Sequence, residues 1–385
     1  MSDIVTAIAP VNIAMIKYWG KRDEKLILPL NDSVSATLDT SVMCAKTSVC
    51  ARPDILENEI WLNGIQTSFS NQRLQNCLNA IKSIASEQQS VKEEFLSWNV
   101  RICSVNNFPT AAGLASSAAG YACLVTALAR LYKVKTDVSK IARVGSGSAC
   151  RSVYGGFVRW HAGVKADGSD SIATQIADSS HWNEMRVLIL VVADTKKHIS
   201  SVKGMSCSVE TSELLKYRVE VSAPARVKQI CEAIKDKDFS TFAEITMKDS
   251  NQFHAVCLDS YPPCVYMTDV SHKIVEIIHK YNEFCGKIKV AYTFDAGPNA
   301  CLYLLEKDVP EILSLIKHMF PTTSDDFIKG LDAPITHIGL LKEFPMKPLE
   351  PNLLKYLIYT KLGDGPQIIC DGSHLLNAQG NLLKH

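Results

Sequence analysis

The sequence lacks any apolar run long enough to cross a membrane. Its longest uninterrupted aliphatic stretch, Val187 to Ala193, is far short of the roughly 20 residues that a spanning helix needs. The first residues also lack the pattern of a secretory signal, because Asp3 stands where positive charge is expected and Pro10 and Asn12 interrupt the apolar stretch. We therefore expect a soluble, cytoplasmic protein that does not bind a membrane.

The chain also lacks an excess of charge of one sign. Lys and Arg together number 41, Asp and Glu together number 40, and the formal net charge is +1. A general electrostatic affinity for nucleic acid or acidic lipid is therefore not expected. Any anion that this protein binds must be held by a local group of residues.

Paired metal-binding or disulfide motifs are missing as well. The thirteen cysteines include no Cys-x-x-Cys pair, which argues against a zinc ribbon or a disulfide framework and favours reduced thiols in a reducing compartment. The ten histidines show neither metal-ligand spacing nor the nucleophile elbow of a hydrolase. Zinc-enzyme and hydrolase functions thus find no support.

What the sequence does contain is enough apolar material for sizeable cores. With 385 residues, 46% of them hydrophobic and 21% charged, the chain suggests two domains or one large one, given a prior of about 150 residues per domain. We find no repeat, no low-complexity tract and no long linker. The predicted boundary is therefore tight, with an N-terminal domain over residues 1–186 and a C-terminal domain over residues 187–385.

Hydrophobic periodicity predicts both helices and strands. Apolar residues recur at helical steps of four and three from Leu114 to Tyr132, which predicts one buried helical face. The short β-branched run Val187 to Val192 predicts a buried strand. Further expected elements are a strand from Ile288 to Phe294, a turn over 295–298, a strand over 300–305, and helices over 212–219 and 224–234. This mixture favours an α+β fold.

A small-residue segment precedes the first of these helices and reads PTAAGLASSAAG, Pro109 to Gly120. Gly113 allows a ligand to approach the backbone, and the helix that starts there presents free N–H groups and its positive dipole end to phosphate. Ser116 and Ser117 add hydroxyls that can hold phosphate oxygen or Mg²⁺. The alternative is a close-packed helix start with a serine cap. The segment lacks the Gly-Lys-Ser/Thr ending of a P-loop.

Two other segments could hold anions. In NIAMIKYWGKRD, Asn12 to Asp23, the ammonium groups of Lys17 and Lys21 are four positions apart and could flank one anion, although both could equally be surface lysines. In SGSACRS, Ser146 to Ser152, the guanidinium of Arg151 can grip a carboxylate or phosphate at two points, unless the segment is a polar surface turn.

A fourth segment, FDAGPNA, places Asp295 between the end of an aromatic strand and a Gly-Pro turn. A carboxylate in this position could orient and deprotonate a hydroxyl. The alternative is an Asx-turn, in which the side chain bonds only to its own backbone.

Together the four segments resemble the diphosphomevalonate decarboxylase family of the GHMP kinase superfamily. The resemblance runs from Asn12 to at least Ala300, with the motifs in the family's order. It implies a two-domain GHMP kinase-like fold with an active-site cleft between the domains, and a homodimer. It also implies that ATP, with Mg²⁺, phosphorylates the 3-hydroxyl of 5-diphosphomevalonate. Phosphate and carbon dioxide then leave to give isopentenyl diphosphate, in the mevalonate route to isoprenoids and sterols.

The resemblance also implies roles for individual residues. The catalytic group would comprise Asp295, Lys17 and Asn12. The substrate would be bound by Tyr18, Trp19, Gly20, Lys21, Arg73, Ser146, Gly147, Ser148, Ala149, Cys150, Arg151 and Ser201. ATP would be bound by Asn106, Ala112, Gly113, Leu114, Ala115, Ser116 and Ser117, with Ser116 also as a ligand of the metal.

Two other functions compete with this interpretation. A GHMP small-molecule kinase that stops at the phosphorylated product could use the same Gly113 segment and Asp295. A non-catalytic ligand sensor on the same fold could bind substrate and nucleotide without turnover, although the presence of Lys17 and Asp295 counts against it. Release of carbon dioxide together with ADP distinguishes decarboxylation from both.

Overall fold

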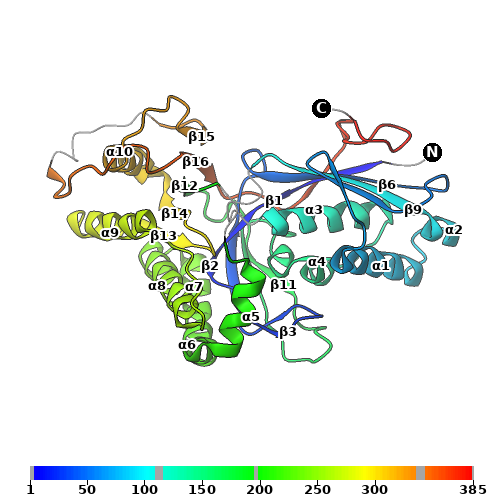
Figure 1. Cartoon of the computed structure of the whole chain (residues 1–385), viewed down its shortest axis with the longest axis horizontal. Coiled ribbons are helices and arrows are strands. Elements are labelled where there is room, and N and C mark those ends of the chain that lie inside the picture. Colours follow the sequence, from blue (N-terminus) through cyan, green and yellow to red (C-terminus); the bar gives the residue numbers. More distant parts are fainter. Residues whose placement is uncertain (1–3, 109–115, 195–197, 335–342, 384–385) are drawn as a thin grey trace.

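The computed structural model describes residues 4–108, 116–194, 198–334 and 343–383. Helices and strands mix along the chain and form two lobes side by side, which confirms the predicted α+β class (Figure 1). The strands of the first lobe are β1 (Val5–Pro10), β2 (Asn12–Ile16), β3 (Lys21–Asp23), β4 (Leu28–Pro29), β5 (Ser33–Thr37), β6 (Cys44–Arg52), β7 (Glu59–Leu62), β8 (Ile65–Thr67), β9 (Asn99–Asn106), β10 (Phe157–Trp160) and β11 (Ala173–Ala177). Its helices are α1 (Gln72–Glu87), α2 (Glu93–Ser97), α3 (Ser116–Leu131), α4 (Ser139–Gly145) and the 3₁₀ turn η1 (Gly147–Cys150).

The remaining elements follow in the second half of the chain. The strands are β12 (Met185–Val191), β13 (Val290–Phe294), β14 (Ala300–Leu305), β15 (Ile328–Gly330), β16 (Tyr356–Lys361) and β17 (Gln367–Ile369). The helices are α5 (Ser201–Thr211), α6 (Glu213–Tyr217), the π-helical turn η2 (Arg218–Ser222), α7 (Ala223–Asp236), α8 (Phe239–Asp259), α9 (Asp269–Phe284), the 3₁₀ turn η3 (Glu306–Asp308) and α10 (Val309–Met319).

The first lobe is built on a six-stranded sheet in the order β17-β1-β6-β9-β7-β8. Helix α3 packs against β1 and β6 of this sheet. The predicted apolar face explains this packing, because Ala118, Val125 and Leu128 are buried, and Tyr132, just beyond the helix, is buried too. The part of the prediction that falls on Leu114 lies outside the described residues.

A four-stranded sheet, β11-β10-β5-β2, connects this lobe to the second. All five residues of β2 are buried. The Tyr303 hydroxyl on β14 donates to the Ile13 carbonyl over 2.9 Å. Strand β2 therefore lies against the second lobe and leads the chain into the space between the two lobes.

The second lobe contains a five-stranded sheet in the order β13-β14-β12-β16-β15. The predicted strand after residue 186 is β12, and all its residues are buried because it pairs with β14 on one side and β16 on the other. The predicted strand-turn-strand unit is the antiparallel pair β13 and β14, in which Phe294 lies opposite Ala300. Asp295 therefore lies directly after the last residue of β13.

The two helices predicted around residues 212–234 are present, with one difference. The first is α6, which passes at Arg218 into the π-helical turn η2 before α7 begins at Ala223. This wider turn places the guanidinium of Arg218 in the interior of the protein, where it is fully buried.

The end of the described chain returns to the first lobe, because β17 pairs with β1 (Figure 1). The boundary between residues 186 and 187 remains a prediction. Within the described ranges, no helix is long and apolar enough to span a bilayer.

Candidate active site

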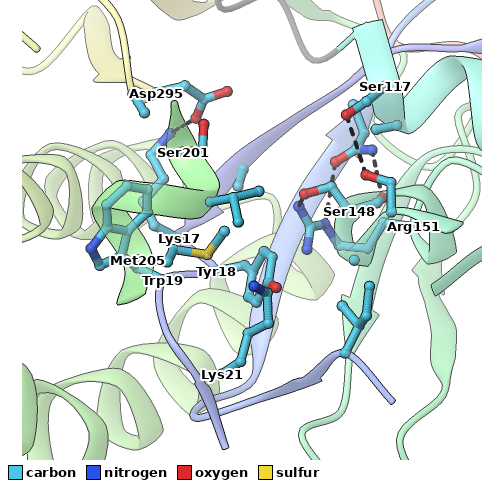
Figure 2. Close-up of a pocket in the computed structure, with 18 of the residues that line it drawn as sticks. Lys17, Tyr18, Trp19, Lys21, Ser117, Ser148, Arg151, Ser201, Met205 and Asp295 are labelled. Atoms are coloured by element: carbon cyan, nitrogen blue, oxygen red, sulfur yellow. Dashed lines mark hydrogen bonds and ion pairs between the residues drawn. The ribbon is translucent and has the colours of Figure 1, made fainter. Parts of the chain in front are cut away.

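A cavity of about 460 Å³ lies where the two lobes meet. Its walls come from the end of β2, the start of β3, the η1 turn, the start of α5, and the turn after β13. Figure 2 shows Asp295, Ser201 and Lys17 on one side and Arg151, Ser148 and Ser117 on the other. Four cationic side chains line the described walls, namely Lys17, Lys21, Arg73 and Arg151. The single carboxylate in these walls is that of Asp295. The cavity therefore suits an anionic ligand.

Lys17 and Asp295 form an ion pair at this cavity. The Lys17 Nζ lies 2.6 Å from Asp295 Oδ1, and the Lys17 side chain is buried while that of Asp295 is 31% exposed. The 2.6 Å bond to Lys17 does not fit an Asx-turn in which Asp295 bonds only to its own backbone. A carboxylate that is bonded to a lysine and partly exposed in the cavity wall can accept a bond from a substrate hydroxyl.

Arg151 is a buried cation held by neutral groups. Its guanidinium donates to Asn12 Oδ1 (3.2 Å), Ser35 Oγ (2.9 Å), Ser33 Oγ (2.6 Å) and Ser148 Oγ (3.2 Å). Burial lowers the pKa of Arg151 from its ordinary value. Among the described residues no carboxylate pairs with it, so its charge is available to an anion in the cavity.

Asn12 positions this arginine and its neighbours. Its amide nitrogen donates to the Ser148 carbonyl (3.1 Å) and to Ser152 Oγ (2.7 Å), while its oxygen accepts from Arg151. The structure thus brings the predicted segments NIAMIKYWGKRD and SGSACRS together, although they are more than a hundred positions apart in the sequence. The surface-turn alternative for SGSACRS does not fit the burial of Arg151.

Tyr18 and Lys21 lie on the wall next to η1. Burial raises the pKa of Tyr18 well above its ordinary value, and its buried hydroxyl has no hydrogen-bond partner in the described part of the chain. The Tyr18 ring packs 4.7 Å from that of Trp160, and a Cβ on Gly147 would come within 2.8 Å of it. Lys21 is buried and pairs with Glu24 over 2.6 Å, so it is not a surface lysine.

A second cavity, of about 530 Å³, adjoins the first. Ser116 and Ser117, at the start of α3, line both cavities, and Asn106, at the end of β9, lines the second. Ser117 Oγ also lies 3.2 Å from Ser146 Oγ, which joins the start of α3 to the SGSACRS segment. The predicted ATP-binding residues Ala112, Gly113, Leu114 and Ala115 fall outside the described residues. The start of α3 therefore lies between two neighbouring cavities, where a helix N-terminus can bind an anion such as phosphate.

Three predicted substrate-binding residues do not line the cavity. Ala149 and Cys150 are fully buried because the 3₁₀ turn directs them into the interior, Cys150 against Trp160. Gly20 is buried with a φ of +91°, and a Cβ at this position would come within 2.6 Å of the Leu30 side chain. The side chains of these three residues therefore lie behind the cavity wall, and their contact with the substrate stays a prediction. Trp19 does line the cavity, but its indole N–H donates to Ser208 Oγ (2.8 Å).

Several residues that shape the site were not predicted from the sequence. Ser33 and Ser35 alternate with apolar residues along β5 and bind Arg151, and this period-two pattern of small polar residues is a signal that could have found them. Ser200 and Met205 of the α5 region also line the cavity, beside the predicted Ser201. His254 lies close to the ion pair, where burial and the charge of Lys17 lower its pKa to about 3.

The described residues contain no cluster of three His, Cys, Asp or Glu side chains that could hold a metal by itself. Mg²⁺ usually keeps several waters and is bound through one or two protein groups plus substrate phosphates. The Ser116 hydroxyl, at the junction of the two cavities, fits this kind of site, in which nucleotide phosphates supply most of the ligands.

Comparison with known proteins identifies the class. The diphosphomevalonate decarboxylase-like N-terminal domain model matches residues 9–173, and the mevalonate 5-diphosphate decarboxylase C-terminal domain model matches residues 187–369. The human diphosphomevalonate decarboxylase is 50% identical over 387 residues, covering 98% of this chain and 96% of that protein. The mevalonate diphosphate decarboxylase from Trypanosoma brucei superposes with a TM-score of 0.88 at 40% identity, covering 97% of this chain and all of that one.

A third relative, MDDEF, was solved in complex with MVAPP, AMPPCP and magnesium. It has a TM-score of 0.75 at 29% identity and covers 96% of this chain and 99% of its own. The fold is thus that of a GHMP kinase-like enzyme. More narrowly, the chain belongs to the diphosphomevalonate decarboxylase family, and the predicted enzyme class, a decarboxylase, is confirmed.

Proposed function

We propose that this protein catalyses the ATP-dependent decarboxylation of 5-diphosphomevalonate to isopentenyl diphosphate, with release of ADP, phosphate and carbon dioxide. The main support for this proposal is the Lys17–Asp295 ion pair in the first cavity. It places a carboxylate beside a cation in a cavity that is lined mostly by cationic side chains among its charged groups. The relative bound to MVAPP, AMPPCP and magnesium supports the choice of substrate, of ATP and of Mg²⁺.

The ion pair acts in phosphoryl transfer. Asp295 accepts a hydrogen bond from the 3-hydroxyl of the substrate and takes its proton as that oxygen bonds to the γ-phosphorus of ATP and ADP leaves. Lys17 orients the carboxylate and brings positive charge to the transferring group. Ser116 and Ser117 hold the nucleotide phosphates. Mg²⁺, when bound with the nucleotide, neutralises the charge of its phosphates.

Other residues hold the substrate for the second step. Arg151 binds the carboxylate, and Tyr18, Lys21 and the Ser146–Ser148 turn bind the diphosphate, with Arg73 as a further contact. The bond between C3 and the phosphorylated oxygen breaks, the bond to the carboxylate breaks, and its electron pair forms the new double bond as carbon dioxide departs. Fixed positions for both anionic ends hold the two breaking bonds in the orientation that the fragmentation requires.

The test is to incubate the protein with ATP, Mg²⁺ and 5-diphosphomevalonate and to quantify ADP, phosphate and carbon dioxide together. Equal amounts of all three support the proposal. ADP without carbon dioxide assigns the protein to the kinase alternative, and absence of ADP release leaves the ligand-sensor alternative.

The protein also acts as a homodimer under this proposal. Exposed apolar side chains lie on α5 (Val209), on α6 (Leu214), at the end of α8 (Leu258) and just after α8 (Tyr261). They support an interface in this region. Sedimentation velocity of the purified protein tests this assignment. A monomer at micromolar concentration would contradict it.

A cytoplasmic location completes the proposal. All thirteen cysteines are free, as expected for a protein in a reducing compartment. Fluorescence microscopy of the protein tagged at its C-terminus tests this location, and a signal confined to an organelle would overturn it.

A further inference from the structure

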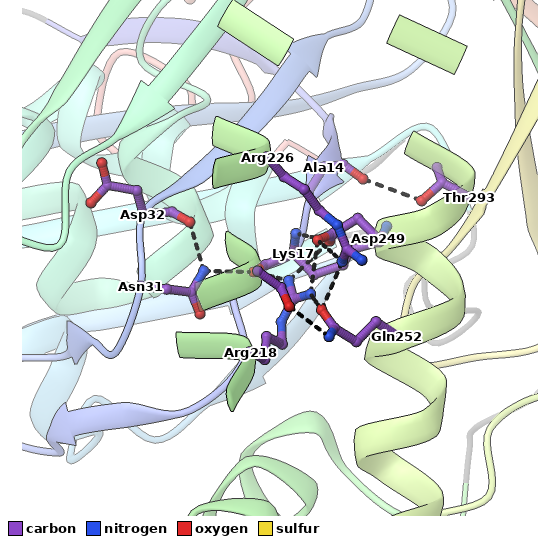
Figure 3. Close-up of polar contacts among 10 residues, drawn as sticks. Ala14, Lys17, Asn31, Asp32, Arg218, Arg226, Asp249, Gln252 and Thr293 are labelled. Atoms are coloured by element: carbon purple, nitrogen blue, oxygen red, sulfur yellow. Dashed lines mark hydrogen bonds and ion pairs between the residues drawn. The ribbon is translucent and has the colours of Figure 1, made fainter. Parts of the chain in front are cut away.

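The backbone of Lys17 is held by side chains from outside its own strand. Lys17 follows the last residue of β2, and its N–H donates to Asp249 Oδ2 over 2.9 Å. Its carbonyl oxygen accepts from Arg218 Nη2 and from Asn31 Nδ2, each over 3.2 Å (Figure 3). These bonds satisfy the polar groups of a buried residue, and they also fix where its side chain begins.

Asp249, on α8, is itself locked in place. Arg218 donates to both of its carboxylate oxygens, over 2.8 and 2.9 Å, and the side chains of this pair are fully buried. Arg226 adds a third bond of 3.2 Å. Burial alone would raise the pKa of Asp249, but the charge and hydrogen bonds of Arg218 hold it below its ordinary value. A buried ion pair adds little net stability to the fold. The main consequence of the Arg218–Asp249 pair is therefore the fixed position of the Asp249 carboxylate.

The next residue of α8, Ser250, binds the backbone beside Asp295, the other member of the ion pair. Ser250 Oγ accepts from the Phe294 N–H over 3.0 Å, and Ser250 is buried. Strand β13 lies at the edge of its sheet, so β14 bonds to only one side of it and the outward N–H of Phe294 needs a partner. Phe294 immediately precedes Asp295.

We propose that Asp249 and Ser250 are positioning residues, which set the distance between the Lys17 ammonium and the Asp295 carboxylate. Consecutive residues of one helix hold the backbone beside each member of the pair, so the two strands cannot shift relative to one another without breaking one of the bonds. A misplacement of about 1 Å can reduce a rate by about 100-fold. This inference rests on the proposed function, in which the pair acts on the 3-hydroxyl.

The experiment compares Ser250→Ala with Thr246→Val. Thr246 lies one turn earlier on α8, is fully buried, and bonds through its hydroxyl only to the Phe242 carbonyl of its own helix in the described structure. Both changes remove one buried hydroxyl, but only Ser250→Ala frees the Phe294 N–H. We expect Ser250→Ala to lower kcat by about 10-fold with KM for 5-diphosphomevalonate within about two-fold. Thr246→Val should leave both constants near wild type, and Ser250→Thr, which keeps the hydroxyl, should restore kcat.

Asp249→Asn provides a second test, because it keeps an acceptor for the Lys17 N–H but loses the ion pair with Arg218. A folded Asp249→Asn protein should also have a lower kcat and an unchanged KM. If this variant does not fold, the comparison of Ser250→Ala with Thr246→Val decides. Wild-type kcat in Ser250→Ala, or an equal loss of kcat in Thr246→Val, would overturn the inference. Failure of the proposed function would be recognised separately, since the unmodified protein would then release no carbon dioxide.

Discussion

The Lys17 Nζ and the Asp295 Oδ1 lie 2.6 Å apart, although the two residues are 278 positions apart in the sequence. Each is the first residue after a strand, Lys17 after β2 and Asp295 after β13. The lysine is almost fully buried, whereas the carboxylate is partly open to the cavity. Both side chains line the cavity, and the carboxylate is the member of the pair that is more accessible to a substrate hydroxyl.

Replacement of Asp295 tests its role most directly. Asp295→Asn keeps the shape of the side chain but cannot take a proton as a carboxylate does. We expect ADP and carbon dioxide formation to fall together by about 10²- to 10⁴-fold, with nucleotide affinity nearly unchanged. Steady-state rates and nucleotide titration of the same preparation measure both. A variant that keeps more than about a tenth of the wild-type rate would contradict a role for Asp295 in proton transfer.

Arg151→Lys should impair substrate use although the charge is kept. Lysine cannot reproduce the planar guanidinium that bonds to Ser33, Ser35 and Ser148, so its ammonium would lie elsewhere. We expect kcat/KM for 5-diphosphomevalonate to fall about 10- to 100-fold, with unchanged nucleotide affinity.

Arg159→Lys is the matched control for this change. Arg159 lies on β10 and pairs with Asp32, and it does not line the cavity. It should keep wild-type efficiency. If Arg151→Lys also did so, the substrate carboxylate would have another partner, and Arg73 would be examined next.

Removal of the metal should abolish turnover. Because ATP reacts as its Mg²⁺ complex, a chelator in excess over magnesium is expected to stop ADP formation, and added Mg²⁺ should restore it. If Ser116 is a ligand, Ser116→Ala should require more Mg²⁺ for half-maximal rate, whereas Ser117→Ala should not. Equal magnesium dependence in both variants would remove Ser116 from the metal site.

Acid stability should report on His254. Burial, with the charge of Lys17, lowers its pKa from 6.5 to about 3 in the folded protein. As the pH falls from 6.5 toward 3, the unfolded chain binds a proton at this position that the folded chain does not, so stability decreases with falling pH. We expect Tm to fall less steeply over this range in His254→Gln. His198→Gln, at an exposed position, should behave as wild type; identical slopes in all three proteins would contradict the assignment.

The local elements and the segments of the site could be predicted from the order of the amino acids alone. Apolar periodicity predicted α3, and the apolar run after residue 186 predicted β12, because local hydrophobic patterns decide which face or strand is buried. The resemblance of four short segments was enough to identify the family, since the chemistry of anion binding requires particular residues at fixed spacings.

How those segments meet depends on the packing of the folded chain. Nothing local to SGSACRS shows that Ala149 and Cys150 point away from the cavity, because the 3₁₀ turn and its packing set their directions. The bonds of Asp249 and Ser250 to the residues at Lys17 and Phe294 likewise join segments that are far apart in the chain. Such contacts follow from the packing of α8 against β2 and β13, and packing between distant segments leaves no periodic signal in the sequence.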